Sequence, residues 1–241
     1  MNPLRTVGLV RRWNVKEVGS PRPFLGSCFS YRWANRLITA AHCVRGVPTD
    51  EIAVDPTPNR GLLQVGGTEV VFHPDADIAI LKSGGLQLAV DPMFSFPEID
   101  GERLLGDDVY GFGFPVDVLG PDANLPVPRL FKGYIQRFVP DHLQGNYRFD
   151  AIELNFQCPG GLSGGPVFST RRPRAVLGMA TGNLRSTTTL ESIEESPGQT
   201  TRLREVISYG VALQLDSVRD WLDSHCPPRD DYSTPASLSE S

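Results

Sequence analysis

The sequence predicts an all-β fold, and three observations carry this prediction. Short apolar runs, such as Phe24–Arg32, are bounded by Gly, Pro, Asn or Asp, a pattern typical of strands joined by turns. Glycine (24) and proline (21) are abundant, and both residues favour turns. Because 40% of the 241 residues are hydrophobic, the chain can form a core, and its length suits one all-β domain or two small barrels.

The predicted strands fall into two sets, separated by a connector at 91–100. The first set comprises Thr6–Trp13, Phe24–Arg32, Arg36–Ala41, Gly61–Phe72 and Asp77–Lys82. The second comprises Asp108–Phe114, Leu130–Phe138, Ala151–Phe156, Pro166–Ser169, Ala175–Ala180 and Ser208–Leu215. We therefore expect one domain over residues 1–95, a second over 96–226 and a flexible tail over 227–241.

Two further segments have their own patterns. Residues 216–225 predict a short helix, because Val218, Trp221 and Leu222 lie on one helical face and Pro227 follows the segment. Residues 184–205 are rich in Ser, Thr, Glu and Arg and break the strand pattern. They predict a long surface loop.

The composition argues against several classes of function. A net charge of −5 and a pI near 5.4 provide no basic face for nucleic acid. No segment reaches the roughly 18 apolar residues of a membrane span. The early apolar run Val7–Val10 is followed at once by Arg11 and Arg12, unlike a secretion signal, so a cytoplasmic location is expected. The four cysteines contain no CxxC pair, and we expect no metal and no cofactor.

The segment CPGGLSGGPVF, residues 158–168, carries the strongest chemical signal. Four glycines surround Leu162 and Ser163 and allow a sharp turn that exposes the serine hydroxyl. The same turn can direct the amides of Gly161 and Ser163 at one point, where they would stabilise an oxyanion. A serine between glycines can also be a purely structural turn.

A serine hydroxyl needs a neighbouring base, and the base needs an orienting carboxylate. His42, in RLITAAHCV, follows an apolar strand and is the best base; His73, His142 and His225 have polar or helix-end contexts. Asp77 heads the apolar run DIAILK. Taken singly, His42 can be a packed structural histidine and Asp77 a turn cap, a role that Asp75 could serve instead.

Together, LITAAHC, DADIAIL and GGLSGGPVF resemble the chymotrypsin/trypsin-like serine peptidase family, in the order His, Asp, Ser and over residues 5–225. The resemblance implies two six-stranded antiparallel Greek-key β-barrels with a short C-terminal helix. It also implies a serine endopeptidase that acts on proteins or peptides through an acyl-enzyme. His42 would be the base, Asp77 its partner and Ser163 the nucleophile, with the Gly161 and Ser163 amides as oxyanion hole.

The resemblance also implies a substrate-binding strand and a specificity pocket. Thr181, Gly182 and Asn183 would pair with the substrate backbone, with Thr181 near Asp77, and Gly210 would line the pocket. The pocket floor would be Gln157 or Phe156. Neither is acidic, which argues against a preference for Arg or Lys in the substrate.

The sequence departs from the secreted members of the family. Leu162 stands where zymogen-activated members have an Asp, which makes the chain more similar to bacterial, HtrA-like protease domains, here without a PDZ domain. Cys28 and Cys43 occupy positions that often form a disulfide, but a reducing cytosol would keep them as thiols. Two alternatives stay open: a catalytically inactive peptide-binding adaptor, and an enzyme held latent by a regulatory protein partner or by the 184–205 segment.

Overall fold

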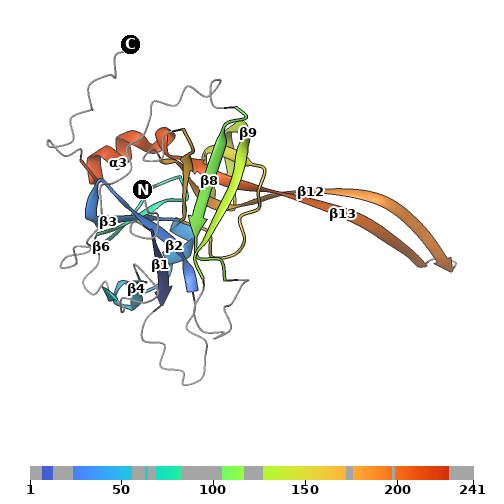
Figure 1. The fold of residues 1–241 in the computed structure, drawn as a ribbon. Helices are drawn as coiled ribbons and strands as arrows, with labels where there is room; N and C mark the ends of the chain where they lie inside the picture. The colour runs from blue at the N-terminus through green and yellow to red at the C-terminus, as the bar shows by residue number, and fades with distance from the viewer. Residues whose placement is uncertain are drawn as a thin grey trace, which may run out of the picture.

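A computed structural model describes residues 7–12, 24–55, 63–64, 69–82, 105–116, 127–171, 176–196 and 199–227. The described chain forms two antiparallel β-sheets and a short C-terminal helix (Figure 1). The all-β prediction with two sheets and a terminal helix is therefore confirmed. The predicted connector at 91–100, the boundary after residue 95 and residues 228–241 lie outside the described residues, so the predicted domain limits stay predictions.

The N-terminal sheet has the strand order β5-β4-β1-β2-β3-β7-β6. Its strands are β1 (Val7–Arg12), β2 (Phe24–Tyr31), β3 (Trp33–Thr39), β4 (Ile52–Asp55), β5 (Leu63–Gln64), β6 (Glu69–Phe72) and β7 (Ala79–Lys82). The helix α1 (Ala41–Val44) follows β3, and the 3-10 helix η2 (Thr49–Glu51) precedes β4. Phe29, Ile38 and Ile80 are fully buried in the core of this sheet.

The C-terminal sheet is a closed barrel in the order β10-β13-β12-β11-β8-β9. Its strands are β8 (Asp108–Gly113), β9 (Arg129–Gln144), β10 (Tyr147–Leu154), β11 (Pro166–Ser169), β12 (Val176–Ser196) and β13 (Gln199–Gln214). Each contains or overlaps one strand of the second predicted set. Ile135, Ile152 and Leu177 belong to its buried apolar cluster.

The C-terminal segment is helical, as predicted. It consists of the 3-10 helix η3 (Leu215–Val218) and the helix α3 (Arg219–His225). Val218 and Leu222 are buried, and Trp221 packs against the same apolar cluster. This face anchors the end of the chain on the core.

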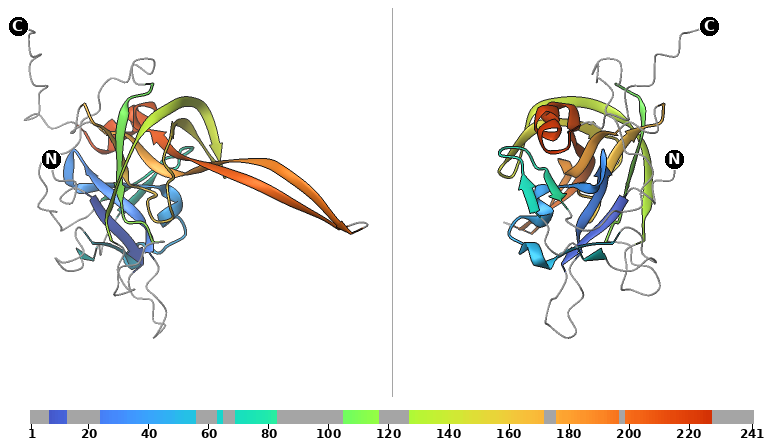
Figure 2. Two further views of the ribbon diagram at one scale, coloured as in Figure 1. Left: turned by 45° about the vertical axis from the view of Figure 1, so that its right-hand side comes forward. Right: turned by 90° about the vertical axis from the view of Figure 1, so that its left-hand side faces the viewer.

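The prediction of a long surface loop at 184–205 is wrong. β12 and β13 continue through this segment as a two-stranded antiparallel ribbon, paired from Leu184↔Tyr209 to Ser196↔Gln199. The ribbon projects far from the barrel (Figures 1 and 2). Its sequence lacks the alternation of a half-buried strand because a ribbon remote from any core has no face that must be apolar. The strand signal that remains is a high content of threonine, a β-branched residue.

Candidate functional site

The loop around Ser163 has a backbone that only glycine permits at two positions. Gly161 has φ +87° and Gly164 has φ +85°, and the Leu162 amide donates to Pro159 O at 3.0 Å. A Cβ on Gly161 would lie 2.5 Å from the Phe114 carbonyl oxygen. A Cβ on Gly164 would collide with the carbonyl oxygen of Ser27. The glycines thus create the predicted sharp turn and let it pack against both sheets.

Two peptide groups of this loop are held in fixed orientations. Gly160 O accepts from the Val116 amide at 2.8 Å, and Leu162 O accepts from the Gly165 amide at 2.8 Å. Because the C=O and N–H of a trans peptide point in opposite directions, the amides of Gly161 and Ser163 point away from these contacts. Within the described part of the chain, neither amide has an acceptor. Two N–H groups without an acceptor among the described residues therefore lie in the loop of Ser163.

His42 and Asp77 contact each other directly. His42 lies in α1, directly after β3, and Asp77 lies in the turn before β7. The imidazole Nδ1 lies 2.6 Å from Asp77 Oδ2, and the His42 amide donates to Oδ1 at 2.9 Å. Since a carboxylate only accepts, Nδ1 carries the proton and Nε2 is left for another partner. The His42 side chain is 40% exposed and that of Asp77 is 0% exposed.

The environment of His42 favours its charged form. Burial by itself would lower the pKa of His42, but the hydrogen bonds to Asp77 and Cys43 and the charge of Asp77 outweigh burial and raise it. The fully buried Asp77 is thus the partner that stabilises an imidazolium at this position.

His73 shapes the turn that carries Asp77, a role that the sequence did not reveal. Its Nδ1 accepts from the Asp75 amide at 3.1 Å and from the Ala76 amide at 2.9 Å. Burial lowers the pKa of His73, which suits a ring nitrogen that must stay unprotonated to accept. The only sequence signal is an acceptor side chain at the start of HPDAD, where a turn was already predicted.

The two halves of the site meet across Gly26. A Cβ on this residue would lie 2.6 Å from Cys43 Sγ and 2.7 Å from Ser163 O. Cys43, which follows His42 in the chain, has its Sγ 3.8 Å from Ser163 O. The Ser163 hydroxyl itself donates to Thr181 O at 3.3 Å, and the described contacts include no hydrogen bond between Ser163 and His42.

Gln144 contacts the same carbonyl as Ser163. Gln144, at the end of β9, donates through Nε2 to Thr181 O at 3.1 Å, and its Oε1 lies 3.2 Å from the Thr181 hydroxyl. That hydroxyl also lies 3.3 Å from Val211 O. Among the described hydrogen bonds, none links Thr181 to Asp77, the neighbour implied by the resemblance. Gln144 could not be expected at the site from the sequence, because β9 extends six residues beyond its predicted end.

Asn183 spans the region where the resemblance places the specificity pocket. Its Oδ1 accepts from the Cys158 amide and its Nδ2 donates to the Cys158 carbonyl, both at 2.7 Å. Gly210 donates its amide to Phe156 O at 2.8 Å, so β13 lies directly against the same segment. Phe156 is half-buried and stacks on Phe131, whereas Gln157 is exposed.

The remaining predicted features are also placed. Leu162 is fully buried, and its side chain belongs to the apolar cluster of the C-terminal barrel. The cysteines at 28, 43, 158 and 226 are buried free thiols, and burial raises the pKa of Cys28 and Cys158 to about 12.

In the described part of the chain, no cluster of three or more potential metal ligands occurs. No described helix is long and apolar enough to cross a bilayer.

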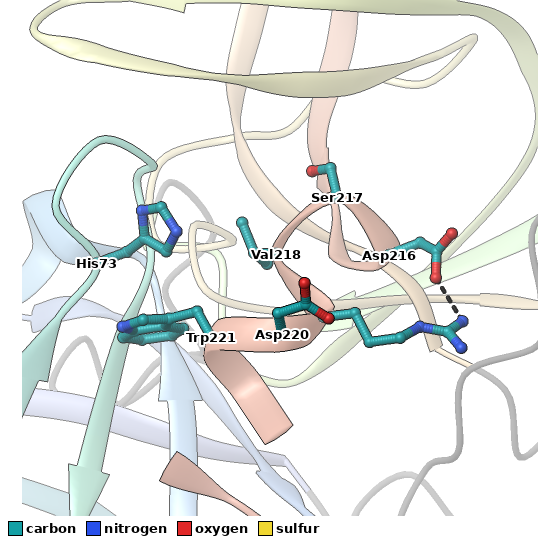
Figure 3. Close-up of a pocket in the computed structure, with 7 residues that line it drawn as sticks. His73, Asp216, Ser217, Val218, Asp220 and Trp221 are labelled. Carbon is teal, nitrogen blue, oxygen red and sulfur yellow. Dashed lines mark ion pairs between the residues drawn. The ribbon is translucent and has the colours of Figure 1, made fainter. Parts of the chain in front are cut away.

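A pocket of about 500 Å³ lies elsewhere, between His73 and the C-terminal helical segment (Figure 3). Its wall includes Trp221, whose ring meets that of His73 edge-on at 5.1 Å, and the ion pair between Asp216 and Arg219. None of the predicted site residues line it. The pocket is connected to the site through Trp221, which packs on His73, the residue that shapes the Asp77 turn.

The paired His42 and Asp77, the free loop amides and the two-sheet fold agree with the comparison to protein families. The model of the trypsin-like peptidase domain matches residues 26–179. The chain belongs to the trypsin-like peptidase family. The predicted resemblance is thus confirmed, and the protein is a serine peptidase of this fold. No curated protein matches the sequence.

Solved structures of proteases share this fold. The active form of the Rv3671c protease from M. tuberculosis is 19% identical, with 95% of this chain and 86% of that chain covered and a TM-score of 0.61. The MamO protease domain from Magnetospirillum magneticum is 16% identical, with 90% and 96% covered and a TM-score of 0.60. The HtrA-type protease AlgW with a tripeptide is 16% identical, with 93% and 61% covered and a TM-score of 0.61.

Proposed function

We propose that this trypsin-like peptidase is an endopeptidase that uses His42, Asp77 and Ser163 as its catalytic triad. One observation carries the proposal: the loop of Ser163 holds two amides, at Gly161 and Ser163, without an acceptor among the described residues, and the Ser163 carbonyl contacts Cys43, the residue next to the histidine that pairs with Asp77. This combination provides a nucleophile, a base and a site for a developing negative charge.

The chemistry follows from these groups. Ser163 Oγ attacks the carbonyl carbon of the scissile peptide bond, and its proton passes to His42 Nε2. The carbonyl π electrons move onto oxygen, where the Gly161 and Ser163 amides donate hydrogen bonds. Collapse of this intermediate breaks the C–N bond, and the leaving amine takes the proton from His42. Water, activated in turn by His42, then hydrolyses the acyl ester and restores Ser163.

A fluorophosphonate probe tests the proposal. The wild-type protein should become covalently labelled at Ser163, and it should cleave an unfolded protein at internal bonds. Ser163→Ala and His42→Ala should each lose labelling and cleavage while keeping the thermal unfolding temperature within a few degrees. Equal labelling of the Ser163→Ala variant would refute the assignment of the nucleophile.

The alternative is a peptide-binding adaptor without catalysis, and one observation favours it. The Ser163 hydroxyl donates to Thr181 O, and Gln144 donates to the same carbonyl. An adaptor with this geometry would bind peptides but remain unlabelled by the probe. If the wild-type protein binds peptides, fails to react and fails to cleave, the adaptor proposal replaces the endopeptidase proposal. A regulatory protein partner and a cytoplasmic location stay predictions.

A further inference from the structure

The two-stranded ribbon presents a free β-edge that begins beside Ser163. The same edge of β12 is occupied closer to the core, where β11 pairs with it up to Met179. The nucleophile loop then continues along this edge, because the Gly164 amide donates to Ala180 O and the Ala180 amide donates to Gly165 O, each at 2.8 Å. Beyond Thr181, no described strand pairs with this edge of β12.

The pairing with β13 shows which groups face the free edge. The Gly210 amide donates to Phe156 O on the far side of β13, so the opposed pair Asn183↔Gly210 does not exchange hydrogen bonds. In an antiparallel pair of this kind, both residues direct their N–H and C=O groups away from each other. Asn183 therefore directs its backbone groups to the free edge. The alternation of the strand gives the same orientation to Arg185, Thr187 and Thr189, before the bulge between Thr189 and Glu191.

The direction of an added strand is also determined. β11 is antiparallel to β12 and begins just after Ser163, which lies at the end of the occupied edge. A peptide that continues this edge in the same direction as β11 must have its C-terminal end beside Ser163. Residues before the scissile bond, numbered P1, P2 and onward away from it, would then extend outward along the ribbon.

We propose that the β12 edge of the ribbon binds a long, extended segment of substrate on the N-terminal side of the scissile bond. The inference rests on the proposed function and specifies its substrate class. With P1 beside Thr181, the residues P3, P5, P7 and P9 face Asn183, Arg185, Thr187 and Thr189. Backbone pairing of this kind recognises extended chains with little dependence on their sequence. Unfolded proteins fit this edge better than short peptides or compact loops.

The ribbon has a physical reason to accept a third strand. A two-stranded antiparallel ribbon without a core is marginally stable in water, and a third strand would satisfy the unpaired groups of one edge. The inner end of the edge is already connected to the catalytic site, so each added pair would extend the bound segment outward.

A shortened ribbon provides the matched variant. Residues 187–206 are replaced by Asn-Gly, which joins Ser186 to Ile207. Because the alternation makes Ser186↔Ile207 a hydrogen-bonded pair, a two-residue turn fits this register. The variant keeps the edge at Asn183 and Arg185 and loses it at Thr187 and Thr189.

Two peptides with the same sequence around the scissile bond test the edge, one beginning at P6 and the other at P10. Binding is measured by fluorescence anisotropy on full-length Ser163→Ala, with the complete and the shortened ribbon, and kcat/KM is measured on the corresponding proteins with Ser163. With the complete ribbon, the longer peptide should bind about tenfold more tightly. With the shortened ribbon, the two peptides should bind equally, and the shorter peptide should bind as it does to the complete ribbon.

Methylation of single peptide nitrogens tests the register. N-methylation at P7 or P9 should abolish the gain from length, whereas N-methylation at P8 should preserve it. Equal binding of the two peptides to the complete ribbon, or equal losses at P7 and P8, would overturn the inference. A ribbon-dependent dimer in sedimentation, without any effect of peptide length, would also overturn it and assign the edge to a second copy of the chain.

Failure of the proposed function gives a different result. The proteins with Ser163 would then cleave neither peptide and resist the fluorophosphonate, while the dependence of binding on length and register would persist. Conversely, cleavage of both peptides at the same kcat/KM, with equal binding, would preserve the endopeptidase and reject the extended edge.

Discussion

His42 and Asp77 form the most polar contact of the site, with a fully buried carboxylate that accepts both the ring proton and the amide of the histidine. The residues around His42 determine whether its neutral or its protonated form is more stable. The negative charge of Asp77 favours the imidazolium, whereas the proposed reaction begins from neutral His42. Activity must therefore rise with pH as His42 loses its proton.

Asp77→Asn should lower kcat/KM by about 10⁴-fold, because the imidazole loses the group that fixes its tautomer and stabilises its charge. The acid limb of the pH profile should also move to lower pH, since Asp77 raises the pKa of His42 above its ordinary value near 6.5. Profiles of kcat/KM against pH measure both effects. Asp75→Asn, in the same turn, is the control and should leave the limb unchanged.

Asn183→Gly should widen the range of residues accepted at P1. The carboxamide of Asn183 bridges β12 to the backbone of Cys158, across the region where a P1 side chain would enter. Removing it should raise the ratio of cleavage after Phe to cleavage after Ala by about tenfold, measured on two peptides that differ only at P1. An unchanged ratio would place the P1 side chain elsewhere.

The candidate residues of the site could be selected from the sequence, but their supporting contacts could not. His42, Asp77 and Ser163 each lie in a short motif with a recognisable composition. Ser27, in contrast, reaches Gly161 across 134 positions of the chain, and no local pattern marks either end of that hydrogen bond.

At the scale of elements, two turns make contacts that hold the site, and these contacts involve residues outside the three motifs. The turn after β6 presents Asp77 and is held by His73, and the β9–β10 hairpin brings Gln144 to Thr181 O. The hairpin is also joined to the first turn, because the Arg148 amide donates to Asp75 O at 3.0 Å. These elements therefore connect the turn of Asp77 to β12 at Thr181.

His73→Ala should lower kcat about tenfold with little change in KM, because the Asp77 turn loses the acceptor for two amides and the triad loses precise placement. His73→Asn provides a side-chain oxygen that can accept from the same amides and should restore most of kcat. Steady-state kinetics of the two variants decide the point. If both variants lose kcat equally, His73 acts by packing on Trp221 instead.

Gln144→Ala should increase kcat/KM about threefold, because Gln144 donates to the carbonyl that is expected to accept the P1 amide of the substrate. The gain should appear mainly as a lower KM. Asn146→Ala, in the turn of the same hairpin, is the matched control and should have no effect. A loss of activity in Gln144→Ala would show that the glutamine supports the site.

The strands themselves illustrate where prediction from the sequence fails. Strands with a buried face alternate or form apolar runs, and nearly all of these were found, with β4 as the exception. The outer parts of β12 and β13 are rich in Ser, Thr, Glu and Arg, with apolar residues that follow no strand alternation, and their pairing continues from the strands of the barrel.

At the scale of the whole molecule, the site exists only where the two sheets meet. The N-terminal half provides His42 and Asp77, and the C-terminal barrel provides Ser163 and the edge of β12 proposed to bind substrate. The order of the three motifs was enough to predict this architecture, because they match a known family. The contacts that hold the two sheets together could be identified only from the structure.

Ser27 is the residue at which the connection between the two sheets can be tested. It lies fully buried in β2, accepts from the Phe114 amide at 2.9 Å and donates to Gly161 O at 2.8 Å, so it links the N-terminal sheet to the residue after β8 and to the loop of Gly161 and Ser163. Ser27→Ala leaves a buried N–H and a C=O without this partner and should cost about 1–3 kcal/mol of unfolding free energy. The kcat should fall as well, because the Gly161 peptide loses a constraint.

Ser30 provides the matched control, since it is equally buried in the same strand and, among the described residues, its hydroxyl has no hydrogen-bond partner. Ser30→Ala should therefore change the unfolding free energy by less than about 0.5 kcal/mol and leave kcat intact. Urea unfolding and steady-state kinetics on both variants separate the two residues. Equal stability losses would mean that burial of a serine, and not the link between the sheets, determines the cost. A stability loss in Ser27→Ala without a change in kcat would mean that the loop of Gly161 and Ser163 keeps its geometry without Ser27, through contacts such as that of the Val116 amide with Gly160 O.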